Sequence, residues 1–95
     1  MDLLEQIAVE DLAVRFTAKW CGPCKKMTPI IDELKTEGFN FVDVDVDENP
    51  TAMDMFGIQS VPTFIRFVDG KIANRVSGAY SKMGLLKKLD LTEKN

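Results

Sequence analysis

The feature that most constrains this chain is a pair of cysteines, Cys21 and Cys24, separated by Gly22 and Pro23 and preceded by Trp20. Two intervening residues bring both sulfur atoms close enough to form and break a disulfide. The chain contains two cysteines, one tryptophan and no histidine, so its whole supply of thiols lies in this short stretch. We expect the fold to be organised around these five residues.

The residues on either side predict where the cysteines lie. Alternating side chains from Leu12 to Thr17 indicate a strand, and helically spaced apolar residues indicate a helix from Cys21 to about Glu37. Cys21 would then lie at the helix N-terminus, where unpaired N–H groups and the helix dipole stabilise a thiolate. Its pKa should fall below the free value of about 8.5. A thiolate is the nucleophile that attacks a disulfide.

Three kinds of site could use such a pair. A zinc site needs further ligands, but the chain has no other cysteine and no histidine. An inert structural disulfide would close too short a loop to restrict the unfolded chain much. The order of strand, cysteine pair and helix favours a redox-active dithiol.

Composition indicates one domain spanning residues 1–95, with a flexible tail at 92–95. The chain is 45% hydrophobic and carries a net charge of −3, without the clustered basic residues of a nucleic-acid-binding protein. No apolar run approaches the length of a membrane span, and the N-terminus does not resemble a secretory signal. We therefore expect a monomer in the cytoplasm, a reducing compartment that suits a cycling thiol pair.

Further motifs lie at distances that match one protein family. The stretch Trp20–Lys25 resembles the active-site motif of thioredoxins, and the similarity runs from about Leu12 to Leu91. The other matching positions are Pro29, Asp45-x-Asp47-x-Asn49-Pro50, Val61-Pro62-Thr63, Asp69-Gly70 and Gly78-Ala79. The cysteine motif together with Val61-Pro62-Thr63 makes the resemblance specific.

The resemblance implies an α/β thioredoxin fold, a mixed sheet flanked by helices. Thioredoxins normally begin with a further strand, but a short helix from Asp2 to Glu10 leaves no room for it here. We therefore expect four strands, with the strand from Asn40 to Val46 at an edge, where acidic residues discourage pairing with another chain. The remaining predicted elements are a helix capped by Asn49 before Pro50, a hairpin of Val61–Val68 and Lys71–Val76, and a helix capped by Ser81.

By resemblance, Cys21 attacks the partner's disulfide and Cys24 resolves the resulting mixed disulfide. We expect Cys21 to be exposed and Cys24 to be buried one turn into the helix. Gly22 and Pro23 complete the loop; Pro23 is tolerated in the first helical turn and, by resemblance, makes the reduced form a better reductant. Trp20 could be an ordinary packed aromatic residue, but beside Cys21 we expect it to belong to the docking surface.

The resemblance also predicts a substrate groove. Pro62 matches a proline that is cis in the family and packs against the disulfide, although cis bonds make up only about 5–6% of X–Pro bonds in folded proteins. Val61 would offer backbone groups to an extended partner segment. Gly78 would border the same groove, because a small residue lets a substrate backbone approach.

Arg15 and Asp43 depart from the family pattern. Most thioredoxins carry a buried aspartate at the first position, thought to help move the proton of the second cysteine, and often pair it with a lysine on the next strand. Here the two charges are reversed. They could form a structural ion pair that offsets burial. Alternatively, Arg15 could stabilise the Cys24 thiolate and weaken the protein as a reductant, since arginine cannot accept a proton near neutral pH.

These observations favour a protein-disulfide reductase that needs no metal or organic cofactor. Its expected partners are a thioredoxin reductase and disulfide-containing client proteins. Two alternatives remain open: a binding subunit of a larger assembly in which the cysteines are dispensable, and a more oxidising thiol oxidase or isomerase. Gly22 and Pro23 argue against the second alternative, whereas Arg15 favours it.

Overall fold

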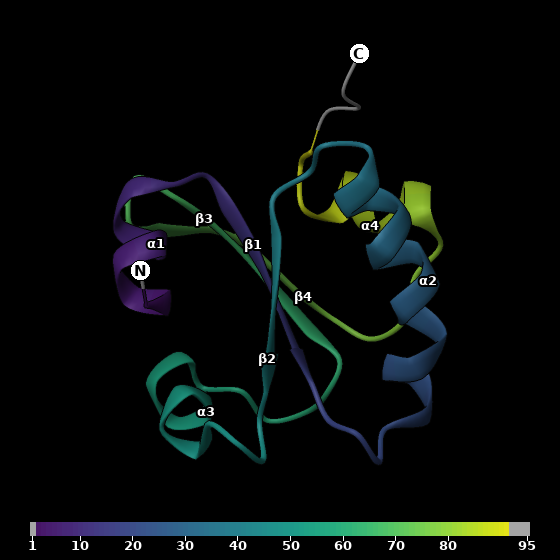
Figure 1. Cartoon of the computed structure of the whole chain (residues 1–95), viewed down its shortest axis with the longest axis horizontal. Coiled ribbons are helices and arrows are strands. Elements are labelled where there is room, and N and C mark those ends of the chain that lie inside the picture. The colour runs from purple at the N-terminus through teal and green to yellow at the C-terminus, as the bar shows by residue number, and fades with distance from the viewer. Residues whose placement is uncertain (1, 92–95) are drawn as a thin grey trace.

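A computed structural model describes residues 2–91, and the tail predicted at 92–95 lies outside the described residues (Figure 1). The helices and strands follow in the predicted order: α1 (Leu3–Val9), β1 (Leu12–Thr17), α2 (Gly22–Thr36), β2 (Phe41–Asp45), α3 (Pro50–Phe56), β3 (Thr63–Val68), β4 (Lys71–Ser77) and α4 (Lys82–Lys88). Among the described residues, no helix combines the length and the apolar character needed to cross a membrane.

Local side-chain chemistry starts most of the helices where the sequence predicts. The Asp2 carboxylate accepts a hydrogen bond from the backbone N–H of Glu5 at 2.9 Å, and the Ser81 hydroxyl accepts one from Gly84 at 3.1 Å. Asn49 is different, because its side chain makes no capping bond and its Nδ2 donates to the carbonyl of a residue four positions earlier. Asn49 therefore occupies the predicted N-cap position before Pro50, but without a side-chain capping bond.

The four strands form one mixed sheet in the order β2-β1-β3-β4. β1 pairs in parallel with β2 across the α2 crossover, whereas β3 is antiparallel to both β1 and β4. The predicted four-stranded sheet with β2 at an edge is confirmed. β1 is a central strand, and five of its six residues are buried.

Helices cover both faces of the sheet: α1 and α3 lie on one side, and α2 and α4 lie on the other (Figure 1). The alternation of β1 divides its side chains between two hydrophobic clusters. Leu12, Val14 and Phe16 pack on the side of α1 and α3, and Ala13 packs on the side of α2 and α4. The buried residues that α2 and α4 contribute to this second cluster are Met27, Ile31, Leu34, Leu85 and Leu86.

The amphipathic helix α2 fixes the place of the cysteine motif. Its apolar stripe is buried against the sheet, and its first residues follow directly from the carboxyl end of β1. Gly38, with a φ of 97°, follows the helix and turns the chain back toward β2. The motif therefore lies where β1 ends, at the start of a helix whose apolar side is buried.

Candidate active site

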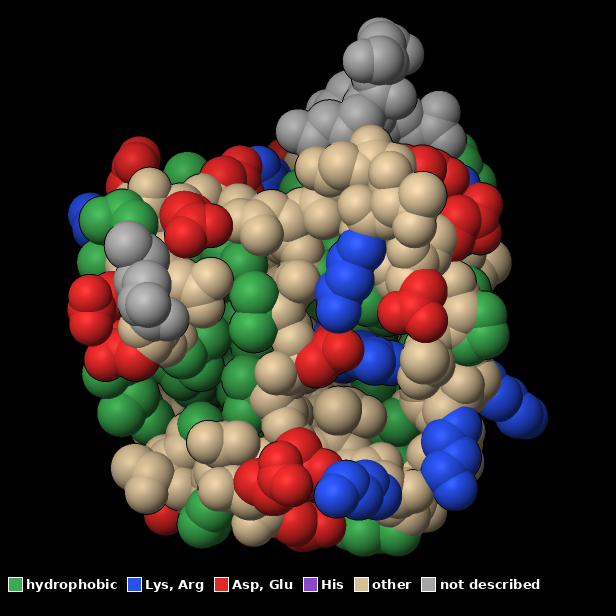
Figure 2. Space-filling view, viewed as in Figure 1, with side chains coloured by type: hydrophobic (Ala, Val, Ile, Leu, Met, Phe, Trp, Pro, Cys, Tyr) green, Lys and Arg blue, Asp and Glu red, His purple; other side chains and the backbone are tan. Residues whose placement is uncertain are grey.

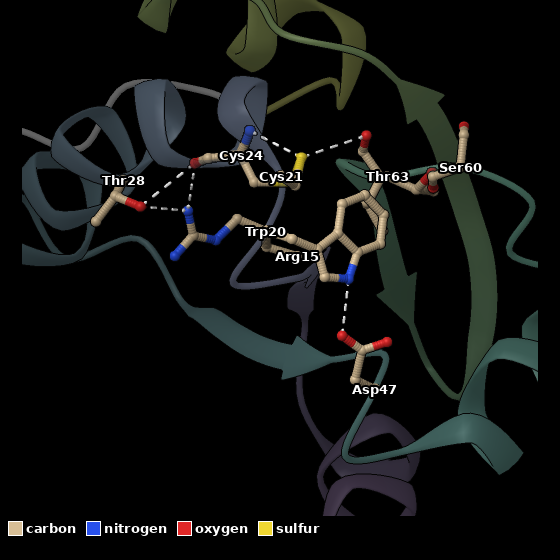
Figure 3. Close-up of a disulfide and its surroundings, with 9 residues drawn as sticks. Arg15, Trp20, Cys21, Cys24, Thr28, Asp47, Ser60 and Thr63 are labelled. Atoms are coloured by element: carbon tan, nitrogen blue, oxygen red, sulfur yellow. Dashed lines mark hydrogen bonds between the residues drawn. A yellow bond between two sulfur atoms is a disulfide. The ribbon is translucent and has the colours of Figure 1, made fainter.

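The two cysteines are joined by a disulfide at the N-terminus of α2. Their Cα atoms are 5.2 Å apart, and Cys21 occupies the N-cap position with an extended backbone. The backbone N–H of Cys24 donates to the Cys21 Sγ at 3.1 Å (Figure 3). After reduction, the same N–H and the helix dipole would stabilise a negative charge on that sulfur atom.

The exposure of the two cysteines differs less than the sequence predicts. Cys24 is 1% exposed, as predicted for the resolving residue, but Cys21 is only 4% exposed. The prediction of an exposed Cys21 is therefore wrong. In the loop before β3, the Val61 carbonyl oxygen lies 3.6 Å from the Cys21 Sγ and helps to cover it.

Trp20 is the most prominent exposed side chain beside the disulfide. It is 68% exposed, which excludes the alternative that it is a packed core residue. Its indole Nε1 donates to the Asp47 Oδ2 at 2.8 Å (Figure 3). Asp47 is itself placed by a turn after β2, where its backbone N–H donates to the Asp45 Oδ1 at 2.8 Å. The hydrogen bond therefore ties the ring to the turn after β2, while most of the side chain stays exposed.

The loop before β3 lies against the disulfide. The Val61–Pro62 peptide bond is cis, as the resemblance predicts. The N–H of Gly78 donates to the Pro62 carbonyl at 2.9 Å, which brings the end of β4 next to this loop. Thr63 supports the arrangement by donating its hydroxyl to the Ser60 carbonyl at 2.7 Å. The structure thus brings the three predicted groove residues together beside Cys21.

Gly78 has a second reason to be glycine. Its φ is 104°, a conformation that residues with a side chain rarely adopt. A Cβ atom built at this position would meet the ring of Tyr80 at 3.9 Å, an ordinary contact distance. Backbone conformation, and not lack of room, therefore makes a larger residue costly at this position in the structure.

Behind the cysteines, Arg15 and Asp43 form the predicted ion pair. The two residues lie opposite each other on β1 and β2. The Arg15 Nε and Nη2 donate to the two Asp43 carboxylate oxygens at 2.8 and 3.0 Å, and Lys35 contacts the same carboxylate at 3.2 Å. Figure 2 shows basic and acidic side chains gathered here between β2 and α2. The reversed charge pair is therefore formed as a structural contact.

The neighbouring cations change the acidity of Asp43. Burial alone would raise its pKa, but the hydrogen bonds and charges of Arg15 and Lys35 outweigh that effect. The pKa of Asp43 is therefore lowered from its ordinary value of 3.8. The carboxylate remains negative through the neutral range and keeps both cations in place.

A surface hollow of about 320 Å³ lies beside Cys24. Its lining comes from the end of β1, the loop after it, the first turn of α2 and the end of β2, namely Thr17, Ala18, Lys19, Cys24, Lys25, Thr28 and Asp45. The hollow gives the neighbourhood of the second cysteine a route to solvent. Among the described residues, no group of histidine, cysteine and acidic side chains is arranged to hold a metal ion.

Comparison with known proteins tests the resemblance. The family model described as Thioredoxin matches residues 3–91. A thioredoxin of Chlamydia caviae is 37% identical over 83 residues, which cover 85% of this chain and 81% of that protein. A thioredoxin of Mycobacterium tuberculosis is 42% identical over 79 residues, covering 80% of this chain and 68% of that protein. The chain belongs to the thioredoxin family.

Solved thioredoxin structures agree with the fold. A thioredoxin from Nicotiana alata superposes with a TM-score of 0.81 at 36% identity, covering 95% of this chain and 80% of that chain. The oxidised mitochondrial thioredoxin 3 of Saccharomyces cerevisiae gives a TM-score of 0.79 at 32% identity, covering 92% and 84%. The predicted α/β thioredoxin fold is confirmed. Family membership together with the Cys21–Cys24 pair identifies the chain as a thiol–disulfide oxidoreductase.

The sequence predicts no role for three residues around this thioredoxin site. Asp47 holds the Trp20 ring, Thr28 accepts from Arg15, and Lys35 shares the Asp43 carboxylate. Thr28 lies four residues after Cys24, so helical spacing places both on one face and could have suggested their proximity. Asp47 belongs to a recognised motif, but its contact crosses 27 positions and depends on the fold.

Proposed function

We propose that this thioredoxin-family protein reduces disulfides in client proteins, with Cys21 attacking and Cys24 resolving. The observation that carries the proposal is the position of the disulfide at the N-terminus of α2. The Cys21 sulfur accepts a hydrogen bond from the backbone N–H of Cys24, and Cys24 is buried in the first turn of the same helix. A thiolate at the first position is stabilised, and the second thiol is close enough to complete the exchange.

The reaction proceeds in two exchanges. The Cys21 thiolate attacks one sulfur of the client disulfide, so a bond forms between Cys21 and the client while the client S–S bond breaks. The released client thiolate takes a proton from solvent. Cys24 then loses its proton and attacks the Cys21 sulfur, which forms the Cys21–Cys24 disulfide and releases the second client thiolate. Two electrons pass from the protein dithiol to the client.

The client is proposed to dock along the groove beside Cys21. The exposed face of Trp20 offers aromatic contact area, which is enriched at binding hot spots. Val61 would pair its backbone with an extended client segment, and Pro62 and Gly78 would shape the groove beside it. Because Cys21 is only 4% exposed, docking must displace or slightly open the cover that the Val61 carbonyl forms.

Regeneration of the dithiol requires an external source of two electrons. We propose a thioredoxin reductase as that partner, on the basis of family membership. A reducing compartment such as the cytoplasm would suit this cycle, because thiols are kept reduced there. In such a cycle the protein carries electrons between the reductase and its clients.

Variants of the two cysteines test the proposal. With thioredoxin reductase and NADPH present, the parent protein should reduce insulin disulfides, whereas Cys21→Ser and Cys24→Ser should both lose turnover. The two variants form a matched pair: Cys24→Ser should trap a covalent adduct with the client because no resolving thiol remains, and Cys21→Ser should form far less. Non-reducing gels measure the adduct.

The same variants separate the enzyme from a redox-independent binding subunit. If the double variant Cys21→Ser/Cys24→Ser preserves the biological effect of the parent, the cysteines are dispensable and the reductase proposal fails. Equal adduct yields from both single variants would contradict the assigned order of attack.

A further inference from the structure

We propose that Arg15 tunes the Cys21–Cys24 couple, with its buried guanidinium favouring the anionic sulfur of Cys24 and making the dithiol a weaker reductant than a neutral residue would. The inference rests on the dithiol–disulfide exchange proposed above and assigns a further residue to it. Arg15 contacts the helix backbone beside the reacting sulfur atoms, so it acts as a positioning residue.

The contacts of Arg15 bind it on two sides. Its Nε and Nη2 donate to Asp43, while Nη1 faces the other way and donates to the Thr28 Oγ1 at 3.1 Å and to the Cys24 carbonyl at 3.4 Å. Figure 3 shows the guanidinium reaching the first turn of α2 from β1. The Arg15 residue is 5% exposed, so water screens this charge poorly.

The charges around Arg15 do not cancel. Asp43 is the carboxylate that contacts Arg15, and it also contacts Lys35, so two cations share one anion. The Asp43 side chain is 35% exposed and the Lys35 side chain 38%, whereas the Arg15 side chain is 6% exposed. The guanidinium therefore lies between the carboxylate and the helix turn that carries Cys24, and its Nη1 edge faces that turn. This placement gives the guanidinium a positive contribution to the potential at Cys24.

Other charged groups surround this turn. Lys19, Lys25 and Asp45 line the hollow beside Cys24, whereas Asp43 and Lys35 pair with each other next to Arg15. Lys19 and Lys25 line the solvent-accessible hollow, where water screens them. Arg15 is the buried member of this set, so we expect it to have the largest effect per charge.

The position of Arg15 also determines where the Cys24 proton goes. A guanidinium has no lone pair to accept a proton at neutral pH. The hollow beside Cys24 is far larger than the space of roughly one water molecule, so solvent lies next to this residue, which is itself 1% exposed. We therefore assign the proton to solvent in this hollow, with Arg15 stabilising the thiolate that remains.

A single-thiol background tests the effect on Cys24 directly. Cys21→Ser leaves Cys24 as the only thiol of the chain, and thiolate absorbance at 240 nm then reports its titration without any enzymatic activity. Adding Arg15→Met should move the titration midpoint upward by about one pH unit, because the favourable charge is removed. Arg15→Lys keeps a positive charge, so its titration midpoint should lie close to that of the variant that retains Arg15.

A second measurement uses the intact cysteine pair. Equilibration with reduced and oxidised glutathione gives the ratio of dithiol to disulfide. At a pH above the Cys24 midpoint, where the thiolate predominates, Arg15→Met should move this equilibrium constant about tenfold toward the disulfide, equivalent to a potential lower by about 30 mV. The matched control is Lys35→Met, which removes the other cation on Asp43 without touching the Cys24 turn and should change the constant by less than about threefold.

A further variant provides a control for loss of folding. Should Arg15→Met leave Asp43 too poorly paired to fold, Arg15→Met/Asp43→Leu removes both charges, and such replacements are often tolerated. It should give a smaller shift in the same direction. Shifts below about twofold in both Arg15 variants, or an equal shift from Lys35→Met, would overturn the inference. Loss of insulin reduction with these shifts intact would instead reject the proposed function alone.

Discussion

At the scale of single residues, the hydrogen bond between Trp20 and Asp47 ties down the ring that we propose as part of the docking surface. The bond is 2.8 Å long and lies at the surface, while the indole is 68% exposed. Asp47→Ala should release the ring and raise the KM for insulin about 2- to 10-fold, because an exposed hydrogen bond contributes about 0.5–1.5 kcal/mol. The kcat should stay nearly constant, and steady-state kinetics measure both.

The neighbouring carboxylate provides the control for this prediction. Glu48 is also exposed, but its carboxylate forms an ion pair with Lys19 at 3.6 Å, whereas the indole N–H donates to Asp47. Glu48→Ala should leave KM near the parental value. An unchanged KM in Asp47→Ala would mean that the orientation of Trp20 does not contribute to docking.

At the scale of elements, Asp43 connects the edge strand β2 to β1 and α2. Its pKa is lowered in the folded protein, so folding is favoured by its negative charge. An acid of this kind contributes stability above its unfolded pKa, near 4, and loses that contribution as the pH falls through its folded value. The free energy of unfolding should therefore decline below about pH 4, as measured by urea denaturation.

Two substitutions isolate the part that Asp43 plays. Asp43→Asn should lower stability at pH 7 and flatten the decline at acid pH, because the lost charge no longer titrates. Asp32→Asn, on the exposed face of α2, should keep the parental pH profile. If Asp43→Asn retains the full acid dependence, other carboxylates must be responsible for it.

At the scale of the whole molecule, β1 joins two hydrophobic clusters into one cooperative unit. Ile31 on α2 and Ile65 on β3 are both 0% exposed and lie in opposite clusters. Replacing either with alanine should lower the free energy of unfolding by about 2–5 kcal/mol. Because the sheet is shared, Trp20 fluorescence and circular dichroism should still report a single transition in each variant. Separate transitions would show that the two layers unfold independently.

Much of the architecture could be predicted because local patterns and global packing agree. The alternation of β1, the apolar stripe of α2 and the Asp69-Gly70 turn each specify a local geometry. Asn49 takes the N-cap position that the sequence predicts, but its amide Nδ2 donates to the carbonyl of Asp45, a local side-chain bond typical of this residue type. The predicted exposure of Cys21 is wrong for a non-local reason, since the carbonyl of Val61, forty positions away, helps to cover the Cys21 sulfur.

The sequence by itself determined the chemistry of this protein: two thiols at a helix N-terminus, the family, and the reversed charges at Arg15 and Asp43. These features depend on residue type and short-range spacing, which the sequence shows directly. Only the tertiary structure decided how the charges act, because the direction of the Arg15 guanidinium toward Cys24 and the sharing of Asp43 with Lys35 arise where β1, β2 and α2 meet. Electrostatic interactions depend on distance and burial, and both are set by packing between segments far apart in the chain.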